Sequence, residues 1–260
     1  MPEAAGLYYE VHGADDAPPL ILSSGLGGSG DYWKPNLRAL ASHFRVIVYD
    51  HRGTGRSDRA LPDAVTVDHL ADDIAALLDA LGIERADVMG HAAGGVAGIA
   101  LALGSPQRLR KLVVVNGWAS PDPHFLRCFA TRLALLRDSG AEAYLKAQPL
   151  FLYPAAWISE HSAELDAELP HQLAGFPGRE TMEKRIAALA AFDVVGQLER
   201  LAVPMLALAA KDDMLVPYTA SEAFEPAPYA STAWMGWGGH ACNVTDPGTF
   251  NLLALDYLRS

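Results

Sequence analysis

Short apolar runs that end in Gly, Ser or Asp recur along the chain, and segments of helical spacing separate them. Strands buried inside a parallel sheet read as such continuous apolar runs, because helices cover both of their faces. The alternation therefore predicts an α/β architecture, with helices flanking a mostly parallel central sheet. The expected strands are Leu7 to His12 at an edge, then Pro19 to Ser24, Phe44 to Tyr49, Ala86 to Gly90 and Leu112 to Asn116, and finally Pro204 to Ala209 and Thr232 to Met235.

Helical spacing dominates the middle of the chain, where no strand pattern is convincing. Pro149, Pro154, Pro170 and Pro177 are expected to break the helices there. We therefore expect a helical lid over residues 121–196, inserted after the sixth strand into a single core formed by residues 1–120 and 197–260. The expected helices are Asp68 to Leu81 in the core, Phe125 to Arg137, Glu142 to Gln148 and Thr181 to Leu189 in the lid, and Pro247 to Leu258 near the end of the chain.

Composition narrows the class of protein. The 260 residues are 50% hydrophobic, which suits one large core. Twenty basic residues against 31 acidic ones give a net charge of -11, so nucleic acid and anionic membranes are poor partners. The chain has two cysteines, no signal-peptide pattern and no apolar run of the ~20 residues that a membrane helix needs. We expect a cytoplasmic protein that acts on a small molecule without a metal or other cofactor, and the sequence leaves a homodimer open.

The segment Gly90 to Gly94, which reads Gly-His-Ala-Ala-Gly, follows an expected strand and precedes a run of small residues. A Gly-x-Ser-x-Gly nucleophile elbow occupies this context, and its glycines allow the strand and the helix to approach each other closely. Here Ala92 stands at the nucleophile position, so the frame is present and the hydroxyl is absent. Taken alone, the segment fits an ordinary glycine-rich turn equally well.

Asp213 and His240 each follow an expected strand and complete the chain order of elbow, acid and histidine. A carboxylate bonded to one ring nitrogen of a histidine fixes its tautomer and leaves the other nitrogen free to transfer protons. The pattern therefore predicts a catalytic acid–histidine pair. The alternatives are a solvated turn carboxylate and a loop histidine with other partners.

These elements resemble those of the α/β-hydrolase superfamily, and the resemblance implies its fold. The superfamily places its acid in an Asp-x-x-x-Pro loop, which favours Asp213 over Asp212. The loop Ser24 to Gly28 stands where this fold places its oxyanion loop. The resemblance thus implies that the backbone N–H groups of Leu26 and Ala93 form the oxyanion hole, and a flexible glycine turn is the alternative.

A narrower resemblance is to the RutD family, the hydrolases of the Rut pathway of uracil degradation. The segments that carry it are Gly25 to Gly30, Asn116 to Trp118, Ala147 to Pro154 and Gly238 to Pro247. Alanine is usual at the elbow of that family, which implies that Ala92 is native. The resemblance also implies a hydrolase of pyrimidine catabolism that acts on carbon–nitrogen bonds other than peptide bonds. Its substrate would be carbamate, broken down to ammonia and CO₂, or 3-aminoacrylate, converted to malonic semialdehyde.

A methyl group cannot form an acyl-enzyme, so Ala92 excludes covalent catalysis at the elbow. We expect His240 to donate or relay a proton, Asp213 to orient His240, and the two N–H groups to hold the substrate carboxylate. Each further candidate for the pocket has ordinary packing as its alternative. These candidates are Ser24, Asn116, Trp118, Tyr153 and Cys242.

Two other functions fit the same sequence. An ordinary esterase or amidase would show this pattern if Ala92 replaced its serine nucleophile by engineering. A hydrolase-like receptor or scaffold would keep the fold and bind a ligand without turnover. Strong ester hydrolysis by Ala92→Ser would point to the first, and tight binding with no rate effect of His240→Ala to the second.

Overall fold

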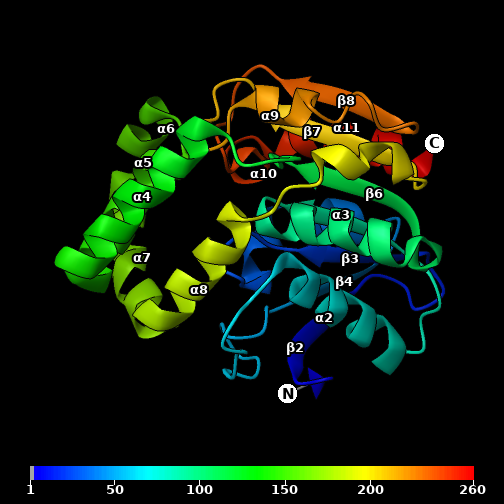
Figure 1. The fold of residues 1–260 in the computed structure, drawn as a ribbon, viewed down its shortest axis with the longest axis horizontal. Helices are drawn as coiled ribbons and strands as arrows, with labels where there is room; N and C mark the ends of the chain where they lie inside the picture. The colour runs from blue at the N-terminus through cyan, green and yellow to red at the C-terminus, as the bar shows by residue number, and fades with distance from the viewer. Residues whose placement is uncertain (1–2) are drawn as a thin grey trace.

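An eight-stranded sheet crosses the molecule in the computed structural model, which describes residues 3–260 (Figure 1). The strand order is β1-β2-β4-β3-β5-β6-β7-β8. The strand β2 pairs antiparallel with both β1 and β4, and the strands from β4 to β8 in this order run parallel to one another. Each predicted strand forms, and the predicted fold class is confirmed. The strands are β1 (Glu3–Ala4), β2 (Leu7–His12), β3 (Pro19–Ser23), β4 (Arg45–Tyr49), β5 (Ala86–His91), β6 (Leu109–Val115), β7 (Met205–Ala210) and β8 (Ala230–Met235).

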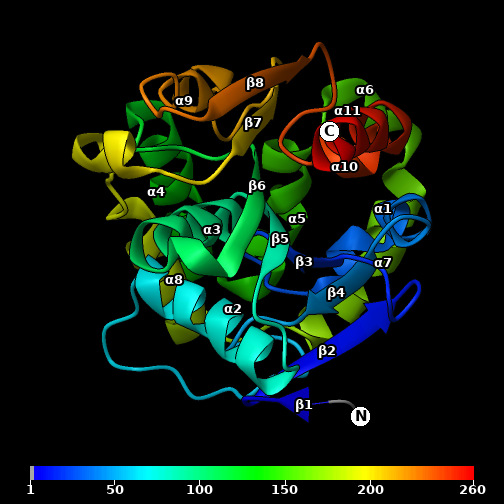
Figure 2. The ribbon, with the colours of Figure 1, turned by 90° about the vertical axis from the view of Figure 1, so that its right-hand side faces the viewer.

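Helices cover both faces of the sheet, so its side chains divide between two cores (Figure 2). On β6, Leu112 and Val114 face the core that α2 and α3 complete, whereas Val113 and Val115 face the core of α1 and α11. This alternation follows from the two-residue period of a strand. The helices around the sheet are α1 (Lys34–Ala41), α2 (Val67–Ala80), α3 (Ala93–Gly104), α9 (Tyr218–Glu222), α10 (Cys242–Thr245) and α11 (Pro247–Arg259).

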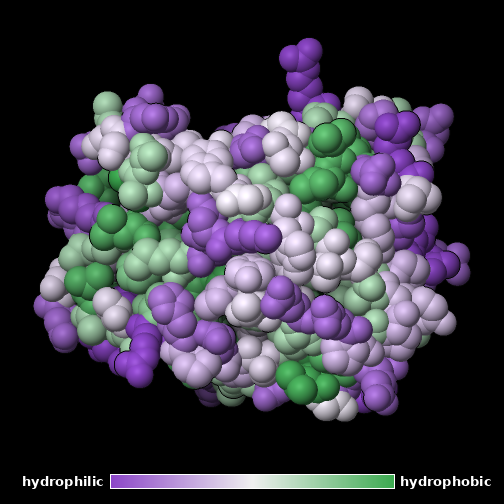
Figure 3. Space-filling view, turned by 90° about the horizontal axis from the view of Figure 1, so that it is seen from above, coloured by the Kyte–Doolittle hydropathy of each residue, from purple (hydrophilic) through white to green (hydrophobic). Residues whose placement is uncertain are grey.

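Five further helices separate β6 from β7 and form one end of the molecule, on the left in Figure 1. Seen from above, this end exposes hydrophobic residues among hydrophilic ones (Figure 3). We call these five helices the helical segment. The predicted division of the chain into a core and a lid over residues 121–196 stays a prediction. The helices are α4 (Pro123–Asp138), α5 (Gly140–Leu152), α6 (Ala155–Glu160), α7 (Ser162–Ala174) and α8 (Arg179–Ala190).

Two prolines of the helical segment do not break helices, contrary to prediction. Pro149 and Pro170 lie inside α5 and α7. Each sits in the second half of its helix, where the turns before it are already formed and one missing N–H removes a single hydrogen bond. The other two prolines act as predicted, since Pro154 precedes α6 and Pro177 lies between α7 and α8.

Candidate active site

The turn from β5 into α3 has the geometry of a nucleophile elbow. Ala92 connects the two elements with φ 46° and ψ −105°, a conformation that costs a non-glycine residue energy. A Cβ on Gly90 would collide with the backbone of Gly94, and a Cβ on Gly94 would collide with the carbonyl of Ser23. Both glycines are therefore required by the close packing of β3, β5 and α3, as the motif predicts.

Asp213 and His240 meet beside this turn. Nδ1 of His240 lies 2.8 Å from Oδ2 of Asp213, and both residues are buried. The other carboxylate oxygen of Asp213 accepts hydrogen bonds from the backbone N–H groups of Leu215 (2.7 Å) and Val216 (2.9 Å). Asp212 faces a different partner, because its Oδ1 accepts from the N–H of Gly239 at 2.9 Å. The carboxylate on His240 is thus fixed from both sides, which holds the ring in one orientation.

The pocket beside Ala92 has a volume of about 580 Å³ and lies between the sheet and the helical segment. Three predicted pocket residues, Ser24, Trp118 and Tyr153, line it, together with Leu26, Ala92, Ala93 and His240. The hydroxyl of Ser24 is buried and has no hydrogen-bond partner in residues 3–260.

Asn116 and Cys242 do not line this pocket, contrary to prediction. Nδ2 of Asn116 donates to the carbonyl of His240 at 2.7 Å, and its Oδ1 accepts from the N–H of Ala210 at 3.0 Å. Both amide atoms of Asn116 therefore form hydrogen bonds that connect the end of β7 to the loop that carries His240. Cys242 is fully buried, and burial raises the pKa of its thiol to about 12.

The loop after β3 is held from the helical segment by a residue that the sequence analysis missed. Arg185 of α8 donates to the carbonyl of Leu26 from Nη2 (3.0 Å) and Nε (3.2 Å), and to Nδ1 of His51 at 2.9 Å. Burial lowers the pKa of Arg185 to about 10, so it remains charged at neutral pH. Leu26 and Ala93 donate no backbone hydrogen bond within residues 3–260, which leaves both N–H groups free for an oxyanion.

His91 is a second residue that the sequence analysis missed, although it lies within the elbow motif. Its Nε2 is 2.7 Å from the carbonyl oxygen of His240, and a carbonyl only accepts, so Nε2 carries the proton. Its Nδ1 is then an unprotonated acceptor with no partner in the described chain. Burial, with a smaller effect of His240, holds the pKa of His91 well below its usual range.

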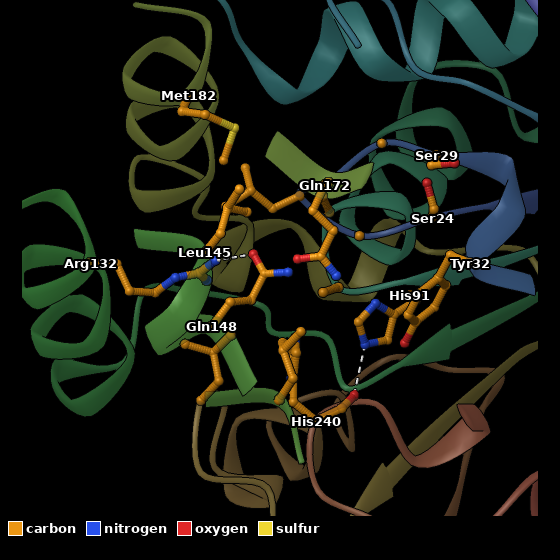
Figure 4. A pocket seen from close by; sticks show the side chains of 18 of the residues that line it. Ser24, Ser29, Tyr32, His91, Arg132, Leu145, Gln148, Gln172, Met182 and His240 are labelled. Carbon is orange, nitrogen blue, oxygen red and sulfur yellow. Dashed lines mark hydrogen bonds between the residues drawn. The ribbon is translucent and has the colours of Figure 1, made fainter. Parts of the chain in front are cut away.

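Arg132 of α4 is the third missed residue, and its guanidinium lines the pocket (Figure 4). It is 3% exposed and has no carboxylate partner in residues 3–260. The helical spacing of the sequence could have predicted that Arg132 is buried. Phe125, Phe129 and Leu136 form the buried stripe of α4, and Arg132 falls on that stripe by helical spacing.

Comparison with known proteins assigns the family. Residues 18–152 match the model of the alpha/beta hydrolase fold. A protein of Caulobacter sp. (strain K31), provisionally named carbamate hydrolase RutD, is 56% identical, with 97% of this chain and 96% of that protein covered. The chain belongs to the RutD family of α/β hydrolases. A RutD protein of Agrobacterium fabrum (strain C58) that bears the same provisional name is 46% identical, with 97% and 98% covered.

Solved structures place this RutD-family chain among hydrolases. An enol-lactonase from Burkholderia xenovorans LB400 is 25% identical, with a TM-score of 0.88 and coverage of 99% of this chain and 98% of that one. A hydrolase from Pseudomonas aeruginosa PA01 is 28% identical, with a TM-score of 0.85 and coverage of 98% and 94%. Within residues 3–260, no helix is both long and apolar enough to cross a membrane. The same part of the chain gathers no three His, Cys, Asp or Glu side chains that could hold a metal ion.

Proposed function

We propose that this hydrolase promotes the breakdown of carbamate in uracil degradation by acid–base catalysis, without a covalent intermediate. The observation that carries the proposal is the buried pair of His240 and Asp213 beside an elbow whose central residue, Ala92, has no nucleophile. The provisional names of the RutD relatives support the substrate. The reaction class is hydrolysis of a carbon–nitrogen bond other than a peptide bond.

The chemistry asks for one proton transfer. His240 donates a proton to the carbamate nitrogen. The C–N bond then breaks, its electrons pass to nitrogen, and ammonia and CO₂ leave the site. Water then returns the proton to the ring. Asp213 orients His240 and stabilises its charged form, and the N–H groups of Leu26 and Ala93 hold the carboxylate.

A related substrate would use the same groups. 3-Aminoacrylate needs a proton on carbon and then addition of water, which gives malonic semialdehyde and ammonia. His240 would supply that proton as well, because it lines the same pocket as Ala92. Both proton transfers fall within the ~10²–10⁴-fold acceleration that a positioned acid or base supplies.

A second candidate is an esterase whose serine was replaced at Ala92, which the likeness to an enol-lactonase favours. Restoring the hydroxyl in Ala92→Ser would then produce strong hydrolysis of a p-nitrophenyl ester. The proposal expects little gain, because its substrate needs no nucleophile.

The deciding experiment follows the decay of freshly generated carbamate at neutral pH through released ammonia. Three samples are compared: buffer, the protein, and His240→Ala at equal concentration. Carbamate should decay faster with the protein than in buffer, and with His240→Ala it should decay at the same rate as in buffer. Equal rates in all three samples would exclude carbamate as the substrate of this pair, and 3-aminoacrylate would be tested in the same way.

A further inference from the structure

Arg132 is a buried cation with incomplete bonding. Its Nη2 donates to the hydroxyl of Tyr144 at 2.7 Å and to Oε1 of Gln148 at 3.3 Å. Its Nε is buried without an acceptor, and its Nη1 forms no hydrogen bond to any residue of 3–260. A guanidinium has five N–H donors in a fixed planar fork, so most of its donors are unused. A buried donor without an acceptor costs free energy. Nη1 is not among the fully buried atoms and is the donor that a ligand could use.

The surroundings of Arg132 stabilise a positive charge without neutralising it. Its guanidinium carbon lies 5.0 Å from the ring centroid of Tyr144 and 5.6 Å from those of Phe129 and Phe151. Aromatic faces attract a cation but carry no negative charge. Asp31 and Glu168 are the carboxylates of the pocket lining, and both are exposed to water. The cation is therefore available to an anionic ligand.

The pocket has two polar ends. In Figure 4 Arg132 reaches in from one side, His91 and His240 lie on the other, and the amides of Gln148 and Gln172 point into the space between. The volume of about 580 Å³ falls in the range of sites for ligands much larger than carbamate. Carbamate has four non-hydrogen atoms and fills roughly the volume of two or three waters, about 30 Å³ each. Carbamate would therefore fill only a small part of the pocket.

We infer that Arg132 is the anion-binding end of the pocket, and that the ligand is an acyclic carboxylate whose far end carries a neutral carbon–nitrogen group at His240. This deepens the proposed function and rests on it for the chemistry at His240. The carboxylate accepts a hydrogen bond from Nη1 of Arg132, while Gln148 and Gln172 line the path of the chain. Carbamate itself would occupy only the end of the pocket at His240.

The test measures binding by titration calorimetry at neutral pH. The probes are the monoamides succinamate, glutaramate and adipamate, which have a carboxylate at one end and a neutral amide at the other. The corresponding diamides have the same length and no charge. One monoamide should bind the protein best and at least 10-fold more tightly than its diamide, since a hydrogen bond to a charged group supplies about that factor.

Variants assign the effect to Arg132. Arg132→Met should weaken binding of the best monoamide about 10- to 100-fold and leave binding of the diamide unchanged. The monoamide affinity of Arg132→Lys should lie between those of the wild type and Arg132→Met. The matched control is Arg127→Met, an exposed arginine of the same helix, which should bind like the wild type.

Several results would overturn the inference. These are no monoamide binding by the wild-type protein, equal binding of monoamide and diamide, and unchanged affinity in Arg132→Met. If Arg132→Met fails to fold, the comparison of monoamide with diamide on the wild-type protein still decides. Failure of the proposed function is distinct, because it would leave monoamide binding intact while carbamate decays at the rate of buffer.

Discussion

Arg185 and Leu26 join the helical segment to the oxyanion loop, with Nη2 of Arg185 3.0 Å from the carbonyl oxygen of Leu26. The carbonyl of Leu26 shares one planar peptide with the N–H of Gly27, so this bond restrains the loop directly beside the N–H of Leu26. A residue more than 150 positions away in sequence thus restrains the loop that carries a donor of the proposed oxyanion hole.

Arg185→Met should therefore slow the catalysed decay of carbamate by about 10-fold and lower the free energy of unfolding by about 2 kcal/mol, as expected for lost charge-assisted hydrogen bonds. Decay kinetics and urea denaturation measure the two effects. Lys184→Met is the matched control, since Lys184 lies on the same helix and pairs with the exposed Glu180. An unchanged rate in Arg185→Met would show that the loop does not depend on this bond.

Asn116→Ala should lower the free energy of unfolding by about 3 kcal/mol, because it leaves the N–H of Ala210 and the carbonyl of His240 buried without these partners. Asn116 also has a φ of 48°, which glycine adopts without strain. Asn116→Gly should then be less destabilising than Asn116→Ala by about 1 kcal/mol. Urea denaturation of both variants checks this, and equal losses would mean that the backbone at Asn116 is not strained.

Ala92→Gly should raise the free energy of unfolding by up to about 1 kcal/mol, because the φ of 46° at Ala92 strains a residue that has a Cβ. The proposed catalysis uses no side chain at this position, so the decay of carbamate should remain accelerated. Denaturation and the ammonia readout test both parts. A loss of acceleration in Ala92→Gly would reveal a role of the methyl group in shaping the pocket.

Acid should destabilise the protein through its buried histidines. Burial lowers the pKa values of His51 and His91 well below the usual value, so the unfolded chain binds protons that the folded chain does not. The free energy of unfolding should fall as pH drops below about 6.5, by at most about 1.4 kcal/mol per pH unit for each histidine. Denaturation between about pH 7 and 5.5 should show this slope, and His91→Gln should make it shallower. The same slope in wild type and His91→Gln would refute the contribution of His91.

The sequence by itself determined the sheet and the order of the elbow, Asp213 and His240. Apolar runs specify buried strands because only such segments can be covered on both faces, and the glycines of the elbow are demanded by close backbone approach. It also determined that Ala92 offers no nucleophile. These features depend on residues that are neighbours along the chain.

Only the tertiary structure decided which residues support and complete the site. Asn116 turned out to support the loop of His240 instead of lining the pocket, and Arg132 and Arg185 enter from helices distant in sequence. Pro170 remained inside a helix, although local propensity argues against it. The physical reason is the same in each case. Hydrogen bonds and burial depend on residues that folding brings together from distant parts of the chain, and the periodicity of a strand or helix does not predict those partners.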